Sequence, residues 1–321
     1  MKHLDPERIE IVSISDVGRQ RSNNQDSYGE GHAPSGARWM MVADGMGGHA
    51  GGETASRVAV ETVSSVVGGS DEQPDVALRT ALEEANRVVH DRASSDARLA
   101  GMGTTGVAML FCGDGSGWVA NVGDSRAYRL RGEHFEQISF DHSLVAELQR
   151  RGVLSEEEAL VHPRRNEVLR SLGVEAEVTV DLHELDLQPG DLYLLCSDGL
   201  SGVMRDPEIA EIVAGQAPAQ AVRTLVDRVN ERGGPDNVTV QIARVPEPDA
   251  ETLPTGGDRR RRIRVLSLAL AVVAALLAIV LLVGLVGELR RTPAVGVSEG
   301  ALGAGEAAGE GAPSPGAPFE E

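Results

Sequence analysis

The chain has 321 residues, a formal net charge of −19 and 41% hydrophobic residues, which suffices for one large folded domain with appended segments. The acidic excess argues against a nucleic acid partner, because a polyanion is bound by clustered Lys and Arg side chains. It is compatible with carboxylates gathered around a metal ion, although most acidic residues are better explained as solubilising surface. Cys112 and Cys196 each lie in an apolar run, which indicates buried, reduced thiols.

Residues up to about 245 mix apolar periodicity with turn residues, as a folded domain does. Short β-branched runs bounded by Gly, Asp and Ser predict strands. Examples, in chain order, are 9–14, 39–43, 106–111, 118–122, 192–196 and 238–242. Helical spacing of apolar residues predicts helices at 53–67, 75–92 and 219–231. Because the strands cluster rather than alternate strictly with helices, we expect a mostly antiparallel α+β architecture with helices outside the sheets.

The composition changes three times beyond the predicted folded domain at 1–245. Residues 246–264 are predicted to be a linker, which ends in a basic run that includes Arg259 and Arg264. Residues 265–286 are almost wholly Leu, Val, Ala and Ile, and at ~1.5 Å per residue they span roughly 33 Å, close to a bilayer core. The basic flank predicts a single-pass membrane protein whose folded domain is cytoplasmic. Residues 287–321 are expected to be a disordered extracytoplasmic tail, and no apolar stretch near the N-terminus suggests a signal peptide.

Four aspartates stand where apolar runs end or begin. Asp44, Asp124 and Asp198 each follow such a run closely, and Asp236 precedes the run at 238–242. Any one of them alone is typical of an ordinary turn, but four in one domain predict converging carboxylates that would repel one another without a cation. Hard cations such as Mg²⁺ or Mn²⁺ take oxygen ligands. The glycine after Asp44, Gly45, would let the backbone approach such an ion, and its carbonyl is a further candidate ligand.

Six stretches resemble, in the same order, the successive motifs of the metal-dependent PPM (type 2C) protein phosphatases. They are 15–26 (SDVGRQRSNNQD), 42–48 (VADGMGG), 101–105 (GMGTT), 123–126 (GDSR), 197–200 (SDGL) and 234–239 (GPDNVT). The resemblance covers about residues 9 to 245. It is strongest to bacterial members that reverse Ser/Thr kinases and are often tethered to the membrane.

The resemblance implies a β-sandwich of two antiparallel sheets flanked by helices, with metal ions at one end. It implies that Asp44 bridges two Mn²⁺ or Mg²⁺ ions. Asp198 and Asp236 would complete the ligands of one ion, and the Gly45 carbonyl would serve the other. A third, weaker ion would use Asp124 together with Asp198.

The resemblance also assigns roles to residues around the ions. Arg21 matches the arginine that contacts substrate phosphate, and Asp26 and Asn237 are expected to support the site from behind the ligands. Gln25 stands where the family often has Glu, so it would hydrogen-bond a metal-bound water without carrying charge. Met46 stands where eukaryotic members have a His proposed as the general acid, and Met cannot donate a proton.

Two other features follow from the same likeness. Residues 142–162 match the family's mobile flap beside the active site, and by themselves they predict two short surface helices. Since Met46 is not an acid, the leaving group needs another proton donor. A water on a metal, at the ion held by Asp124, is favoured over His49, because a cation makes its water a better acid.

The expected function is therefore that of a protein Ser/Thr phosphatase. It would hydrolyse phosphoserine and phosphothreonine by attack of a hydroxide that bridges two divalent ions, and would oppose Ser/Thr kinases in bacterial signalling. Two alternatives stay open: a pseudophosphatase that only binds phosphoproteins, and a membrane receptor whose outer segment senses a ligand. The metal carboxylates disfavour the first alternative, and the scarcity of apolar residues in 287–321 disfavours the second.

Overall fold

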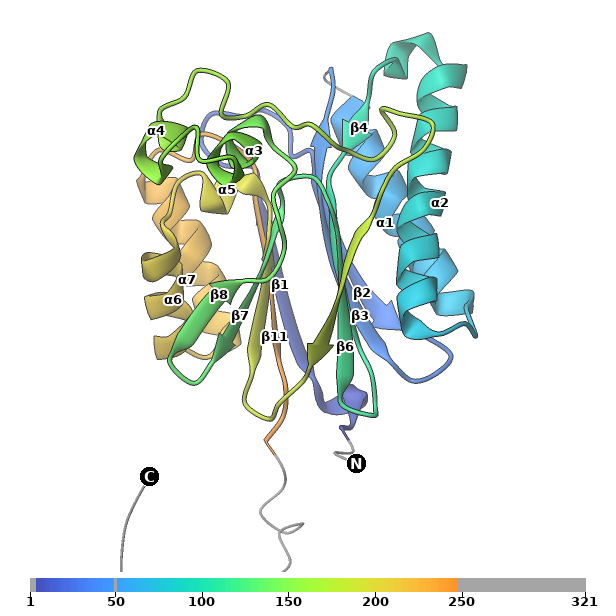
Figure 1. The fold of residues 1–321 in the computed structure, drawn as a ribbon, viewed down its shortest axis with the longest axis vertical. Helices are drawn as coiled ribbons and strands as arrows, with labels where there is room; N and C mark the ends of the chain where they lie inside the picture. The colour runs from blue at the N-terminus through green and yellow to red at the C-terminus, as the bar shows by residue number, and fades with distance from the viewer. Residues whose placement is uncertain (1–3, 49–50, 248–321) are drawn as a thin grey trace, which may run out of the picture. The chain divides into compact units, whose positions relative to one another are not determined.

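The computed structural model describes residues 4–48 and 51–247, which form two antiparallel β-sheets packed face to face with helices on both outer sides (Figure 1). The predicted α+β sandwich is thereby confirmed. The linker beyond residue 247, the predicted membrane helix at 265–286, the tail at 287–321 and His49 lie outside the described residues. Within the described residues, no helix is both long and apolar enough to cross a membrane.

The five-stranded sheet has the spatial order β1-β11-β10-β7-β8, and every neighbouring pair is antiparallel. Its strands are Glu10–Asp16 (β1), Arg126–Arg131 (β7), His134–Gln137 (β8), Leu192–Cys196 (β10) and Val238–Arg244 (β11). The last strand pairs with the first, so that Asp16 lies opposite Val238. The loop that follows β1 therefore lies beside the loop that precedes β11.

The six-stranded sheet has the order β2-β3-β5-β6-β9, with the short β4 paired to the end of β3. Its strands are Asp26–His32 (β2), Arg38–Met46 (β3), Gly103–Thr104 (β4), Gly106–Phe111 (β5), Ser116–Val122 (β6) and Asp181–Asp186 (β9). Since Asp26 is the cross-strand partner of Asp44, the start of β2 and the end of β3 meet at one edge of the sandwich.

Helices cover the outer face of each sheet, as Figure 1 shows. The six-stranded sheet carries Gly51–Gly69 (α1) and Pro74–Ser95 (α2), while the other carries Asp198–Ser201 (α5), Asp206–Gly215 (α6) and Pro218–Glu231 (α7). Two short helices, Leu144–Arg150 (α3) and Glu156–Leu160 (α4), lie where the flap was predicted. Each of these begins at a serine, Ser143 or Ser155, whose hydroxyl accepts a backbone N–H of the first turn. The remaining helical turns are Pro6–Arg8 (η1) and Ala97–Leu99 (η2).

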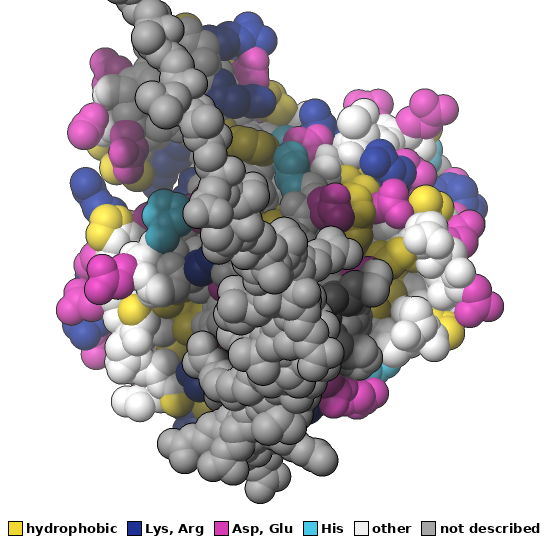
Figure 2. All heavy atoms as spheres, turned by 60° about the horizontal axis from the view of Figure 1, so that its bottom comes forward, with side chains coloured by type: hydrophobic (Ala, Val, Ile, Leu, Met, Phe, Trp, Pro, Cys, Tyr) yellow, Lys and Arg dark blue, Asp and Glu magenta, His cyan; other side chains and the backbone are white. Residues whose placement is uncertain are grey.

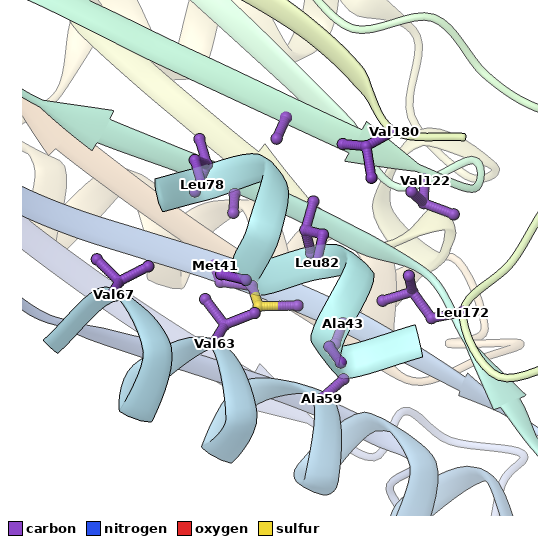
Figure 3. Close-up of a cluster of buried hydrophobic side chains, with 14 of the residues drawn as sticks. Met41, Ala43, Ala59, Val63, Val67, Leu78, Leu82, Val122, Leu172 and Val180 are labelled. Atoms are coloured by element: carbon purple, nitrogen blue, oxygen red, sulfur yellow. The ribbon is translucent and has the colours of Figure 1, made fainter. Parts of the chain in front are cut away.

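Alternation along β3 distributes its side chains between two layers of core. Trp39 and Met41 point to the helices and join a cluster with α1 and α2, in which Met41 lies beside Val63 (Figure 3). Met40 and Val42 face the other sheet and join the cluster between the sheets. A strand buried on both faces explains why 39–43 is a continuous apolar run rather than an alternating one.

The described surface mixes charges of both signs. On the side shown in Figure 2, acidic, basic and hydrophobic side chains are interspersed where grey atoms do not cover them. Several of the charges form ion pairs within one helix, such as Arg57 with Glu61 on α1 and Arg87 with Asp91 on α2. Such exposed pairs contribute little stability each, and they are typical of solvated helix faces.

The structure corrects two details of the sequence interpretation. Asp44 and Gly45 do not follow their strand as a turn: β3 continues to Met46 because β2 and β4 pair with it there. The strands β2, β4, β7, β8 and β9 and the helices α5 and α6 were not among the predicted elements. The first of these, DSYGEGH, has polar residues and two glycines, so its pairing with β3 rather than its own pattern makes it a strand.

Candidate active site

A polar pocket of about 310 Å³ lies at one end of the sandwich, where β3 and β6 end and β11 begins. Eight of the nine predicted site residues line this pocket. They are Arg21, Gln25, Asp44, Gly45, Asp124, Asp198, Asp236 and Asn237. The ninth, Asp26, is buried next to them.

The end of β3 is paired with β2 on one side and with β4 on the other, and Thr105 adds two hydrogen bonds to Asp44. The Asp44 N–H donates to Thr105 Oγ1 at 2.9 Å, and the Asp44 carbonyl accepts from the Thr105 N–H at 2.8 Å. Gly45 packs so closely that an added Cβ would lie 2.1 Å from the carbonyl oxygen of Gly52. Only glycine fits there, and the close packing fixes the backbone position from which the Asp44 side chain extends.

The other three pocket aspartates come from loops and from a helix start. Asp124 follows the turn at Gly123, between β6 and β7, and Asp198 is the first residue of α5. Asp236 lies just before β11, where its side chain accepts a hydrogen bond from the Arg21 guanidinium at 2.7 Å. Four separate segments thus bring their carboxyl groups to one pocket.

Asp26 lies behind the pocket in a buried position. Its Oδ2 accepts hydrogen bonds from Ser197 Oγ at 2.8 Å and from Thr239 Oγ1 at 2.7 Å, while its Oδ1 is buried with no hydrogen-bond partner. Burial raises the pKa of the Asp26 carboxyl to about 7, although both hydroxyl donors lower it. An unpaired buried carboxyl oxygen is costly, so its retention here indicates a partner such as a metal-bound water.

Burial and mutual repulsion also raise the pKa values of three carboxyl groups that line the pocket. Burial raises the pKa of Asp44 well above its ordinary range, and the charges of Asp26, Asp198 and Asp124 raise it further. Burial likewise raises the pKa of Asp124 to about 7, with the charge of Asp198 as the next cause. Burial also raises the pKa of Asp198, although its hydrogen bond with Asp44 lowers it. Such a cluster favours cations, because a nearby positive charge stabilises the ionised carboxylates.

The donor set fits hard divalent cations. Carboxylate oxygens and backbone carbonyls are the ligands that Mg²⁺ and Mn²⁺ accept, and Gly45 lines the pocket beside the aspartates. Among residues 4–48 and 51–247, no three His, Cys, Asp or Glu side chains stand close enough together to hold one ion by themselves. The carboxyls instead line the pocket walls, so the protein would supply part of each coordination sphere and water the remainder, as is usual for Mg²⁺.

Arg21 is half exposed and pairs with Asp236 at the pocket rim. Its predicted role is contact with substrate phosphate, and Arg21 lines the pocket with Nη2 bound to Asp236, a predicted metal ligand. A guanidinium has five N–H donors, so this one contact leaves others for phosphate oxygens.

Asn237 and Gln25 organise the loop that carries Arg21. The Asn237 side chain accepts from the Gln25 N–H and donates to the carbonyls of Val17 and Asn23, each at 2.8 or 2.9 Å. Asn237 therefore holds the loop after β1 against the start of β11. The Gln25 side chain lines the pocket, and its Nε2 donates a long hydrogen bond to the Gly47 carbonyl at 3.4 Å.

Comparison with known proteins decides the family. The sequence pattern described as protein phosphatase 2C matches residues 18–243, which is more than half of the chain. The chain belongs to the protein phosphatase 2C family. This phosphatase is 39% identical over 234 residues to the serine/threonine phosphatase stp of Listeria monocytogenes, covering 71% of this chain and 92% of that one. It is 38% identical over 250 residues to the protein phosphatase PhpP of Streptococcus pneumoniae, covering 76% and 100%.

A solved structure of the catalytic domain of the Ser/Thr phosphatase PstP contains two manganese ions. It matches this phosphatase with a TM-score of 0.66 and 35% identity, covering 74% of this chain and 99% of that one. The family is metal-dependent, which agrees with the donor set of the pocket.

Besides Met46, four residues line the pocket of the phosphatase without having been predicted as site residues: Gly47, Thr105, Asn166 and Val168. Thr105 belongs to a recognised motif, so its proximity to Asp44 was a signal that the sequence interpretation left unused. Asn166 stands at the end of the stretch predicted to be the flap and Val168 lies just beyond it, and only the tertiary fold brings them to the aspartates. Met46 also lines the pocket, where it offers no proton donor.

Proposed function

We propose that this protein phosphatase hydrolyses phosphoserine and phosphothreonine in proteins with two divalent ions held by Asp44, Asp198, Asp236 and the Gly45 carbonyl. The observation that carries the proposal is the convergence of aspartates from separate segments on one pocket, where burial and repulsion favour cations. The ions would supply positive charge for the phosphate dianion and an activated water for its hydrolysis. Mn²⁺ is the first candidate, because a related structure contains it, and Mg²⁺ is the second.

The chain's own residues bind and orient the substrate. Arg21 would hold phosphate oxygens with the N–H donors that Asp236 does not use, and such charge-assisted bonds are geometrically selective. Asp26 and Gln25 would orient waters at the ions from behind, with the unpaired Oδ1 of Asp26 as the acceptor. Asn237 holds the loop after β1 against the start of β11 and need not touch the substrate.

A third ion at Asp124 and Asp198 is proposed as the source of the acid. Asp124 lines the same pocket, and Met46 cannot protonate the leaving alkoxide. Asp124→Ala should therefore lose much more kcat on a phosphopeptide than on an aryl phosphate, whose leaving group needs little protonation. His49→Ala should keep most of kcat on both. A loss of about a hundred-fold for His49→Ala on phosphopeptide alone would make His49 the acid instead.

The substrates are proposed to be Ser/Thr-phosphorylated proteins, including those of a cognate Ser/Thr kinase. Support comes from the relatives, which are named serine/threonine phosphatases. The direct experiment is hydrolysis of a phosphothreonine peptide by the purified chain, with Mn²⁺ and after chelation. Turnover that requires the metal supports the proposal, whereas binding of the peptide without turnover would identify a pseudophosphatase.

Attachment to the membrane is proposed from the sequence alone. Residues 1–245 would form the cytoplasmic catalytic domain, 246–264 the linker, 265–286 the membrane helix and 287–321 the outer tail. A reporter fused after Glu321 should be accessible outside the cell, while one fused at the N-terminus should not. An internal position for both reporters would refute the span or its orientation.

A further inference from the structure

His142 makes two hydrogen bonds to Gly123, the residue before Asp124. The Gly123 N–H donates to His142 Nδ1 at 3.0 Å, and the His142 N–H donates to the Gly123 carbonyl at 2.9 Å. Gly123 has φ +111°, and an added Cβ would lie 2.6 Å from Thr105 Cγ2, so only glycine fits this turn. Because glycine is the residue with the greatest backbone freedom, the turn needs outside contacts to stay in place.

The other side of the same imidazole faces a charged pair. His142 Nε2 lies 3.1 Å from Asp181 Oδ2 and 3.1 Å from Arg170 Nη1, and Arg170 donates to Asp181 Oδ1 at 2.7 Å. Since Nδ1 accepts a hydrogen bond from Gly123, the neutral ring carries its proton on Nε2. The Nε2–H group then donates a hydrogen bond to Asp181. The His142 side chain is about 95% buried, so both ring nitrogens are served by protein.

His142 begins the flap and is also bonded to the segment that returns from the flap to the pocket. Its carbonyl accepts from the Leu169 N–H at 2.7 Å, and Ser143 forms a β-bridge with Val168. Val168 lines the active-site pocket, and Arg170 follows it by two residues. One residue is therefore bonded to the Asp124 turn through Nδ1 and to the flap's return segment through its carbonyl. Its Nε2 is bonded to Asp181, which in turn accepts from Arg170 of the return segment.

We propose that His142 is a positioning residue that holds the Asp124 turn and the flap's return segment in fixed relation to each other. Its Nδ1 contact sets the place of the Asp124 carboxyl, and its Nε2 contact sets the place of Val168 and Asn166 against the substrate. The inference rests on the proposed function, because it gives Asp124 a part in metal binding and the flap a part in substrate binding.

Two substitutions separate the two sides of the ring. In His142→Asn, the side-chain oxygen sits near the place of Nδ1 and still accepts from Gly123, but nothing reaches Asp181. In His142→Gln, the longer amide reaches toward Asp181 but presents no acceptor at the place of Nδ1. Asp181→Asn is a third variant that weakens the Nε2 side without touching His142. His134→Gln, on the exposed β7–β8 hairpin, is the matched control.

The variants are compared by kcat and KM on a phosphothreonine peptide and an aryl phosphate, and by the Mn²⁺ concentration for half-maximal rate. His142→Gln should lower kcat about ten-fold or more and raise the Mn²⁺ requirement, because a buried N–H loses its acceptor beside a metal ligand. His142→Asn and Asp181→Asn should instead raise KM for the peptide several-fold more than KM for the aryl phosphate. His134→Gln should match the wild type.

A purely structural role gives a different pattern. If all three variants lower the melting temperature but keep wild-type kcat, KM and Mn²⁺ requirement per folded molecule, the proposal is wrong. It is also wrong if His142→Asn and Asp181→Asn disagree in which parameter they change. A wild-type chain that shows no Mn²⁺-dependent turnover would refute the proposed function itself, so the two failures are distinguishable.

Discussion

Two regions of the same sandwich bury side chains of opposite character. Between the sheets, a cluster of buried side chains is large and apolar, with Met40, Met109 and Phe111 among its members. At the end of the sheets, the buried or partly buried groups are carboxyls, including Asp26 and Asp124, whose pKa values burial raises to about 7. The first region stabilises the fold by removing apolar surface from water. The second opposes folding unless a cation is present, which marks it as functional.

The largest effect should come from removing a carboxylate at the polar end. Asp198→Asn removes a proposed ligand and one of the repelling charges, so hydrolysis should fall by about 10³-fold or more. The metal-free variant should melt at the same temperature as the metal-free wild type or higher, because repulsion with Asp44 is relieved. Phosphopeptide turnover and calorimetry check both expectations. Near-normal turnover with Mn²⁺ would contradict the two-ion site.

A substitution between the sheets should instead lower the stability of the fold and leave turnover unchanged. Met109 is fully buried in the layer between the sheets, and Met109→Ala should destabilise the fold by about 2–5 kcal/mol. Its kcat per folded molecule should stay at the wild-type value, since Met109 lines no part of the active-site pocket. Denaturant unfolding with parallel kinetics measures both. Val76→Ala, an exposed site on α2, is the control and should change stability by less than about 0.5 kcal/mol.

Arg21 lies at the border between protein and substrate. Arg21→Ala should lower kcat/KM about 10- to 100-fold, on the order of 1.5–3 kcal/mol, by loss of a charge-assisted phosphate contact. The affinity for Mn²⁺ should change much less, because Arg21 donates to Asp236 but is no ligand. Kinetics and metal titration separate the two effects. An unchanged kcat/KM would reduce Arg21 to a surface partner of Asp236.

The smallest expected effect is a shift in melting temperature with pH. The pKa values of Asp26 and Asp124 are raised from 3.8 to about 7 in the metal-free fold, so the folded state binds more protons than the unfolded state between these values. The stability of metal-free protein should therefore fall as pH rises from about 4 to about 7. The gain in melting temperature on adding Mn²⁺ should grow over the same window, because protons compete with the metal. A gain independent of pH would show that the carboxyls are not the binding groups.

Much of the fold could be predicted from the sequence for a physical reason. Runs such as 39–43 and 192–196 are buried on both faces, so their composition alone marks them as strands, and the aspartates that follow them were recognisable as a set. The strand β2 was hidden, because β3 rather than its own pattern holds it in the sheet. Asn166 reaches the pocket only through the fold of the flap, and the pairing of Arg21 with Asp236 joins segments more than 200 residues apart. No local pattern encodes such contacts.

The count of bound metal ions tests the central claim most directly. Equilibrium dialysis against Mn²⁺ should find at least two ions per wild-type chain, since the pocket aspartates are proposed to hold two and a weaker third. The Asp198→Asn variant should bind fewer ions and lose hydrolysis in parallel. A wild-type chain that binds fewer than two ions while it hydrolyses phosphopeptide at full rate would contradict the account.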